Sequence, residues 1–165
     1  MNRSIQTRFS ITVTASLFVF LLALSFAGTV SGASWNGIEP FKSRRAEVVQ
    51  ILGQPISEST DGVLRFKVMG GSVQISFVDG KFVTAKKLKP ELEGTVLQIV
   101  LQHEHSSDTP ESLKLLKNRD FARDDVQGVS IFRNAKEGVH YTFIEGTLKT
   151  TRYTFADGQL GRMRR

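Results

Sequence analysis

Apolar and polar residues alternate along several stretches of the chain, which is the pattern of a β-strand with one buried face. The alternation over 72–78 ends at Asp79-Gly80, a dipeptide typical of two-residue hairpin turns. The pattern therefore predicts that 72–78 pairs with a returning strand at 81–88. Further strands are predicted over 63–69 and 95–103.

The same pattern returns 66 residues later without a gap. SVQISFVDGKFVTAKK, which begins at Ser72, matches GVHYTFIEGTLKTTRY, which begins at Gly138. Seven of 27 aligned positions are identical between 61–87 and 127–153. Two unrelated amphipathic hairpins would share the alternation but not the glycines, so we expect a duplicated unit. In the second unit the pattern predicts a turn at Glu145-Gly146 and strands over 129–134, 139–144, 148–155 and 159–165.

Each unit is predicted to open with a short helix. In the first unit, Ser43 is a suitable N-cap and Gly53 a suitable C-cap. In the second unit, Thr109 and Pro110 suit the start of a helix and Asn118 suits its end. The helices would cover the apolar face of the strands.

These elements predict an α+β fold of two tandem helix-plus-antiparallel-sheet repeats. The repeats are 43–105 and 106–165, with about four strands each, after a lead-in at 34–42. Together they form one domain that shares one core or one continuous sheet.

Residues 1–33 have the composition of a secretory signal peptide. Arg3 and Arg8 precede an apolar run at 9–30, and the small residues at 31–33 suit cleavage. We therefore expect an exported protein, periplasmic or secreted. The alternative is an uncleaved anchor at 9–30, because a run of this length can span a bilayer. The chain has no cysteine, which excludes disulfides and attachment of a lipid to cysteine.

The chain has a formal net charge of +6, and much of the basic surplus lies in two short clusters. Such clusters can contact an anionic membrane or cell-wall surface, although many are simply solvated. Basic residues are not interleaved with aromatic residues as in a nucleic-acid platform, so we expect no nucleic-acid binding. The clustered residues are Lys86, Lys87, Lys89, Arg162, Arg164 and Arg165.

The segment EVVQILGQP at 47–55, followed by VDGKF at 78–82, resembles the small outer-membrane lipoprotein (SmpA/OmlA) family. Doubling the unit resembles the β-lactamase-inhibitor-protein-like fold. The first resemblance covers 43–87, and it extends to the second half only through the repeat. It implies a binding role, in envelope assembly or protein inhibition. The chain lacks the lipidated cysteine of the lipoproteins, and its opening also resembles uncharacterised exported bacterial proteins.

Antiparallel sheets often leave one face to water, and we expect such an open sheet face to bind a protein partner. Its largest side chains, His140 and Tyr153, are the first candidates for contact. The predicted binding residues are Gln74, Ser76, Val83, Lys87, His140, Thr142, Lys149, Thr151 and Tyr153.

The chain carries little that suggests catalysis. His103 and His105 would point the same way on a strand and could share a metal, with His140 or Asp108 as a third ligand. The chain has no nucleophile elbow and no phosphate-binding loop. We therefore expect a non-catalytic binding or envelope-assembly module without a cofactor. A metal protein or enzyme that uses the histidines, and a structural domain without a specific ligand, are the alternatives.

Overall fold

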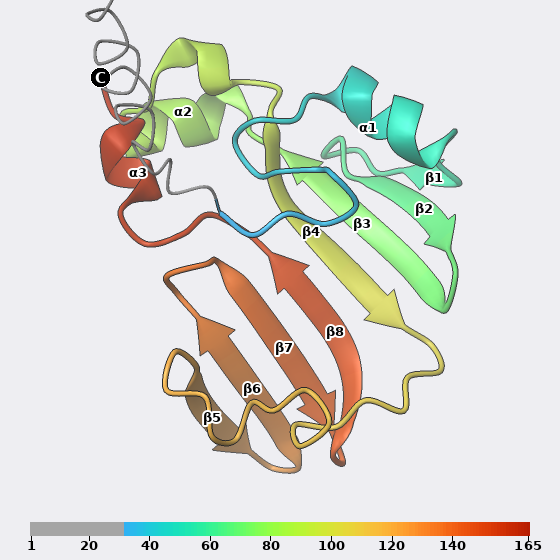
Figure 1. Cartoon of the computed structure of the whole chain (residues 1–165). Helices are drawn as coiled ribbons and strands as arrows, with labels where there is room; N and C mark the ends of the chain where they lie inside the picture. The colour runs from blue at the N-terminus through green and yellow to red at the C-terminus, as the bar shows by residue number, and fades with distance from the viewer. Residues whose placement is uncertain (1–31) are drawn as a thin grey trace, which may run out of the picture.

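The computed structural model describes residues 32–165 (Figure 1). The predicted signal peptide or anchor lies outside these residues, apart from positions 32 and 33. The helices are α1 (Arg45–Leu52), α2 (Gly80–Lys86), the short 3-10 helix η1 (Pro90–Leu92) and α3 (Gln159–Arg162). The strands are β1 (Ser57–Glu58), β2 (Leu64–Val68), β3 (Gly71–Phe77), β4 (Val96–His103), β5 (Ala122–Val126), β6 (Val129–Asn134), β7 (Val139–Ile144) and β8 (Thr147–Tyr153).

The strands form one eight-stranded sheet in the order β1-β2-β3-β4-β8-β7-β6-β5. All neighbouring strands are antiparallel. The central pair is β4 and β8, in register from Ile99 opposite Tyr153 to Gln102 opposite Thr150. The predicted antiparallel sheet with a few helices is therefore confirmed, and the sheet is continuous.

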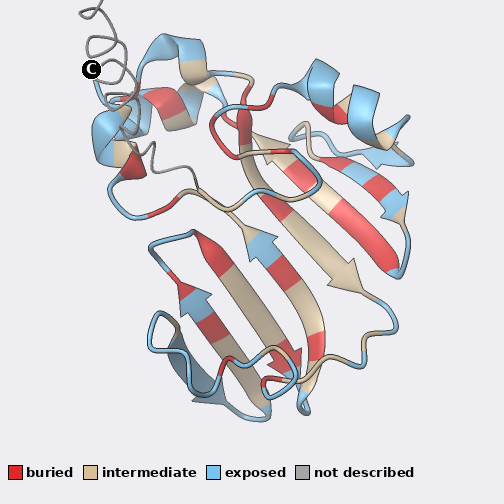
Figure 2. Ribbon diagram, viewed as in Figure 1, coloured by how far each residue is buried: buried red, intermediate tan, exposed pale blue. Residues whose placement is uncertain are grey.

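One face of the sheet is covered over much of each half. The helix α1 and the lead-in pack on β2, β3 and β4, and the 104–121 segment packs on β6, β7 and β8 (Figure 1). The core in the first half includes Val48, Phe66 and Ile75. In the second half, Leu115 packs against Phe132 and other side chains of this face. Figure 2 shows buried and exposed residues alternating along β2 and at the end of β6, as expected for strands with one covered face.

The strand predicted at 81–88 is wrong, because α2 occupies most of it. The Asp79 carboxylate accepts a hydrogen bond from the Phe82 N–H at 2.6 Å, so Asp79 caps a helix and does not turn a hairpin. Val83 is buried at the end of the sheet together with Val78 and Leu88. Val78 directly follows β3, and Leu88 follows the C-cap of α2. The helix places Val83 between them in this core.

Three other predictions differ from the structure, and one strand was not predicted. The segment expected to form a helix after Thr109 forms turns, and Lys114 within it has a φ of 57° that a helix does not allow. The segment expected to form a strand at 159–165 contains α3. The edge strand β5 was not predicted, because all its residues are exposed and give no apolar alternation. The first helix begins at Arg45, and Ser43 instead accepts a hydrogen bond from the Glu39 N–H at 3.1 Å.

The hairpin predicted at Glu145-Gly146 is confirmed, since Ile144 pairs with Thr147. The two halves nevertheless pair differently at equivalent positions. Phe66 lies opposite Val73, whereas Phe132 lies opposite Tyr141. The second hairpin is thus shifted by two residues, which leaves each side chain on the same face.

Candidate binding face

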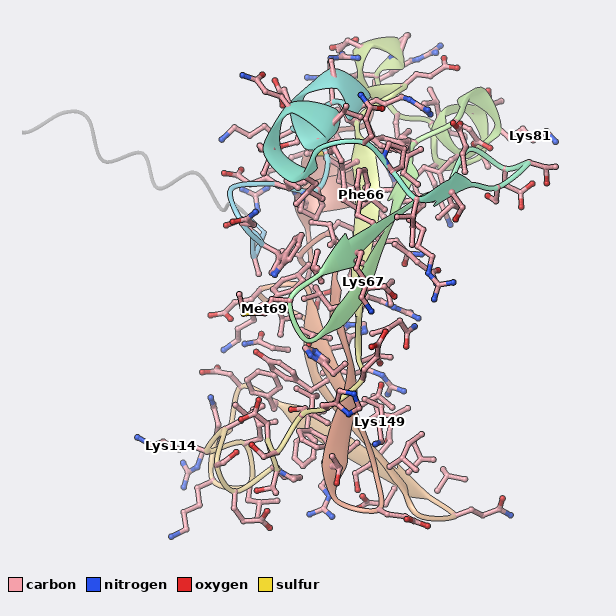
Figure 3. All side chains as sticks on the ribbon, turned by 90° about the vertical axis from the view of Figure 1, so that its right-hand side faces the viewer. Phe66, Lys67, Met69, Lys81, Lys114 and Lys149 are labelled. Atoms are coloured by element: carbon pink, nitrogen blue, oxygen red, sulfur yellow. The ribbon has the colours of Figure 1, made fainter. Side chains whose placement is uncertain are left out.

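The face of the sheet opposite α1 carries two rows of side chains that run across the strands. The first row joins Arg65, Gln74, Val100, Arg152, His140 and Arg133 in register. The second row joins Lys67, Ser72, Gln102, Thr150, Thr142, Ile131 and Asp124. Figure 3 shows the sheet from its edge, with α1 and the 104–121 segment on one side and mainly side chains on the other, apart from α2 at one end. We call this surface, defined by the two rows, the open face.

The open face is basic. Its rows hold four cationic side chains and one anionic side chain, Asp124. Arg133 forms an ion pair with Asp124, and Lys67 forms one with Glu104 at 3.0 Å. The Arg152 side chain is exposed and makes no hydrogen bond or ion pair with any residue from 32 to 165. Arg152 therefore offers an unpaired guanidinium near the middle of the sheet.

His140 lies between two of these arginines. It is opposite Arg152 on one side and opposite Arg133 on the other. Burial lowers the pKa of His140, and the charges of Arg152 and Arg133 lower it further. Together with Thr142, Thr150 and Ile131, these three side chains line a hollow of about 110 Å³. The hollow presents two guanidinium groups, an imidazole and two hydroxyls from three neighbouring strands.

The structure places only some predicted binding residues on the open face. Gln74, Ser76, His140 and Thr142 share its side of the strands. The Ser76 hydroxyl is buried and has no hydrogen-bond partner among the described residues. Val83 is buried in α2, and Lys87 is the left-handed C-cap of that helix, so neither belongs to the sheet. Lys149 lies at an irregularity in the pairing of β8 with β7.

Thr151 and Tyr153 lie on the covered face. Thr151 is 4% exposed, and Tyr153 packs against the core that α1 covers. The reason is a shift in the pairing of β7 and β8. Phe143 lies opposite Leu148, but the preceding Thr142 lies opposite Thr150. A shift of one residue moves every following side chain to the other face, which exchanges Thr151 and Tyr153 for Thr150 and Arg152.

The sequence-based prediction missed the arginines of the first row. Arg65 and Arg133 lie between buried residues of β2 and β6. This alternation predicts that both arginines lie on the face opposite the core. Arg152 could not be assigned in the same way, because its face depends on the irregular pairing of β7 with β8.

The structure does not bring the three histidines together. His103 lies on the covered face, where its Nε2 is 2.9 Å from the Thr151 hydroxyl in a hydrogen bond. His140 lies on the open face, and His105 follows the end of β4 and is exposed. Within residues 32–165, no group of three metal-ligating side chains is assembled. The metal site suggested by the spacing of these histidines therefore has no geometric support.

The two half-buried histidines predict a pH dependence of stability. Burial lowers the pKa of His103 below its ordinary value of 6.5, an effect that Asp108 partly offsets, and the pKa of His140 is lowered as well. Protonation therefore favours the unfolded chain, and this stability is lost as the pH falls below about 6.5 towards the lowered pKa values. We expect the free energy of unfolding, measured with urea, to decrease between pH 7 and 5.5. The double variant His103→Gln, His140→Gln should show a flatter profile, and an unchanged profile would contradict this assignment.

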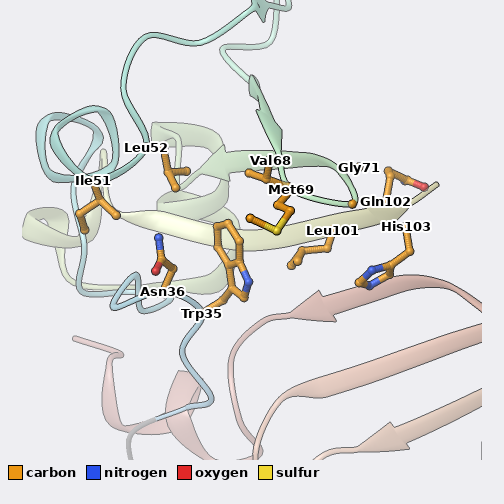
Figure 4. A pocket seen from close by; sticks show the side chains of 11 residues that line it. Trp35, Asn36, Ile51, Leu52, Val68, Met69, Gly71, Leu101, Gln102 and His103 are labelled. Atoms are coloured by element: carbon orange, nitrogen blue, oxygen red, sulfur yellow. The ribbon is translucent and has the colours of Figure 1, made fainter. Parts of the chain in front are cut away.

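A cleft of about 600 Å³ lies on the covered side, where Trp35 faces α1 and the tip of the β2–β3 hairpin. Figure 4 shows Trp35 among Ile51, Leu52, Met69 and Leu101, all apolar. Met69 is fully exposed and Ile51 is 43% exposed. Trp35 thus fills part of an open cleft beside the core, whose lining also includes Asn36, Gln102 and His103. Its volume would admit a small molecule or a side chain of a partner.

The predicted basic clusters come together at the end of the sheet that carries α2 and α3. Leu88 and Arg164 form an isolated β-bridge, which joins the chain after α2 to the C-terminal segment. Lys86, Lys87, Lys89, Arg162, Arg164 and Arg165 are all exposed.

Comparisons with family models, with curated proteins and with solved structures found no match to the chain. The resemblance to small outer-membrane lipoproteins therefore stays a prediction. In the part of the chain from residue 32 onward, no helix has the length and apolar character needed to cross a membrane.

Proposed function

We propose that the chain is an exported, non-catalytic binding protein whose open face binds an acidic protein partner. The observation that carries this proposal is the uncovered face of the sheet, with an unpaired Arg152 at its centre. The core of the fold lies on the face that α1 and the 104–121 segment cover. Basic residues aligned across the other face are therefore not required for its packing. An alignment that continues from β2 to β6 favours a contact surface over scattered solvated charges.

The charges of the face favour an acidic partner. Arg133 already holds one carboxylate, that of Asp124, which shows that the guanidinium at this end of the row is accessible to such a group. Arg152 lies in the same row as Arg133, with His140 between them. It forms no ion pair with a carboxylate among residues 32–165. An Asp or Glu side chain of a partner would fit the fork of this guanidinium. Thr142 and Thr150 could add hydrogen bonds from the same hollow.

We further propose that the two halves of the sheet arose by duplication of one unit. The strand order supports it, because β1 to β4 run inward from one edge of the sheet and β5 to β8 run inward from the other. Val73 on β3 and Val139 on β7 are also both buried. In this reading the second unit lost its helix, and the first acquired α2 where the second retains a hairpin turn. The envelope role implied by the resemblance to small lipoproteins is compatible with a binding sheet.

Site-specific photo-crosslinking tests the binding role. A photo-reactive side chain at Thr142, in the hollow of the open face, is expected to trap a partner from envelope extract. The matched control carries the same group at Lys117, which is exposed on the segment that covers the other face. A partner trapped only from Thr142 supports the proposal. Equal trapping from both positions, or none from Thr142, contradicts it and favours a structural domain without a specific ligand.

A further inference from the structure

We infer that the end of the molecule formed by α2 and the C-terminal segment docks on an anionic lipid bilayer, a contact separate from the open face. The inference rests on six exposed cations that two remote parts of the chain bring to one place. We call them the basic end: Lys86, Lys87, Lys89, Arg162, Arg164 and Arg165.

Backbone contacts fix these two segments against each other. The Lys89 N–H donates to the Met163 carbonyl at 2.9 Å, and the Arg165 N–H donates to the Lys87 carbonyl at 3.1 Å. The Arg165 Nε also donates to the Leu88 carbonyl at 3.0 Å. The basic end is therefore part of the fold and does not depend on two independent flexible tails.

The basic end gathers six cations that have no ion-pair partner among the described residues. All six ion pairs among residues 32–165 involve other cations: Lys42, Arg45, Lys67, Arg123, Arg133 and Lys136. The cations of the basic end form none with any described residue. Unpaired cations such as Arg152 and Lys117 also occur elsewhere, but at the basic end six of them are brought together, an arrangement that an external anion would stabilise.

Acids lie only near the N-terminal end of α2, where Lys81 is also exposed. Asp79 caps its N-terminus, and the Glu93 carboxylate lies beside Gly80 in the first turn. Lys86 lies in the last turn and Lys87 at the C-cap. The C-terminal end of α2 thus carries two exposed cations, while Asp79 and Glu93 lie at its other end. A rigid apolar core that includes Leu88 and Met163 supports the cationic side.

An extended anionic surface fits this arrangement better than a single small anion. Lysine and arginine side chains on two segments, with long flexible stems, suit many dispersed charges rather than one fixed group. A bilayer that contains anionic lipid offers such a surface and attracts clustered Lys and Arg residues.

Vesicle co-sedimentation tests the inference. The purified protein is expected to bind phosphatidylcholine vesicles that contain about 30% phosphatidylserine, to leave pure phosphatidylcholine vesicles unbound, and to dissociate as salt is raised. The variant Lys86→Gln, Arg162→Gln should bind roughly 25-fold more weakly, because each lost charge is expected to weaken binding about fivefold. These two positions make no side-chain hydrogen bond with any described residue, so the fold should persist.

The matched control is Lys117→Gln, Arg119→Gln, which removes the same charges from an exposed segment on the other half of the molecule. Its binding should stay within about twofold of the original protein. Equal weakening of both variants would show that net charge alone drives binding, and absence of binding to the anionic vesicles would also overturn the inference. Tighter binding to a soluble polyanion such as heparin than to the vesicles would assign the basic end to a polymer instead. None of these outcomes depends on the open face, which the crosslinking at Thr142 tests separately.

Discussion

The variant Arg152→Glu is expected to weaken binding of the partner trapped at Thr142 by about 100-fold or more. A glutamate at this position removes the unpaired guanidinium and places a negative charge opposite the partner's carboxylate. Like charges brought together at an interface cost several kcal/mol, and about 3 kcal/mol corresponds to a factor of roughly 100 in affinity. The affinity of the purified partner, measured by titration calorimetry at fixed salt, gives the result directly.

Arg65→Glu is the control for this prediction. Arg65 lies in the same cross-strand row and its replacement changes the net charge equally, but it lies on the other half of the sheet. We expect a loss of less than about tenfold, as is typical for a charge at the rim of an interface. If both variants weakened binding to the same extent, a diffuse electrostatic attraction would explain the data and the hollow around His140 would have no special role.

The sequence predicted the sheet well wherever a strand has one buried face. The strands β6 and β7 were predicted with the bounds that the structure shows, because Val129–Asn134 and Val139–Ile144 end at clear turn residues. The prediction of α1 was also close to the observed bounds, because Gly53 clearly marks the end of the helix. Local pattern was sufficient there because local and tertiary preferences agree.

The errors arose where the same local pattern has two outcomes. Asp79-Gly80 and Glu145-Gly146 look equivalent, yet the first starts a helix and the second turns a hairpin. The shorter Asp79 side chain can reach the Phe82 N–H, whereas Glu145 has a φ of 49° and sits in the turn itself. Tertiary packing of Val83 then favours the helix in the first half.

The binding face was predicted only in part, for a related reason. The side of a strand on which a residue lies depends on pairing register, and the shift at Thr142 and Phe143 reverses β8. No local property of Thr151 or Arg152 shows this shift. Consequently the sequence indicated an open face and several of its residues, but the central arginine was assigned only by the structure.

Gly138→Ala is expected to destabilise the fold by roughly 3–5 kcal/mol. Gly138 has a φ of 73°, and a Cβ placed on it would lie 2.3 Å from the Thr154 carbonyl oxygen and 2.8 Å from Phe155. These are backbone atoms and cannot move aside as the end of a side chain can. The Thr154 N–H also donates to the Gly138 carbonyl at 2.8 Å, so separating the two segments would break this contact.

Gly146→Ala is the matched control, because Gly146 has a φ of 75° and its added Cβ would meet nothing within 4 Å. This variant should cost only about 1–2 kcal/mol, from the left-handed backbone alone. Urea denaturation of both variants measures the difference, and similar costs would show that the contact with Thr154 adds nothing. The prediction also bears on function, since Phe155 packs on Phe41 with ring centroids 5.6 Å apart. Gly138 therefore helps to hold the sheet of the open face against the core beneath the basic end, and its replacement should weaken both proposed contacts together.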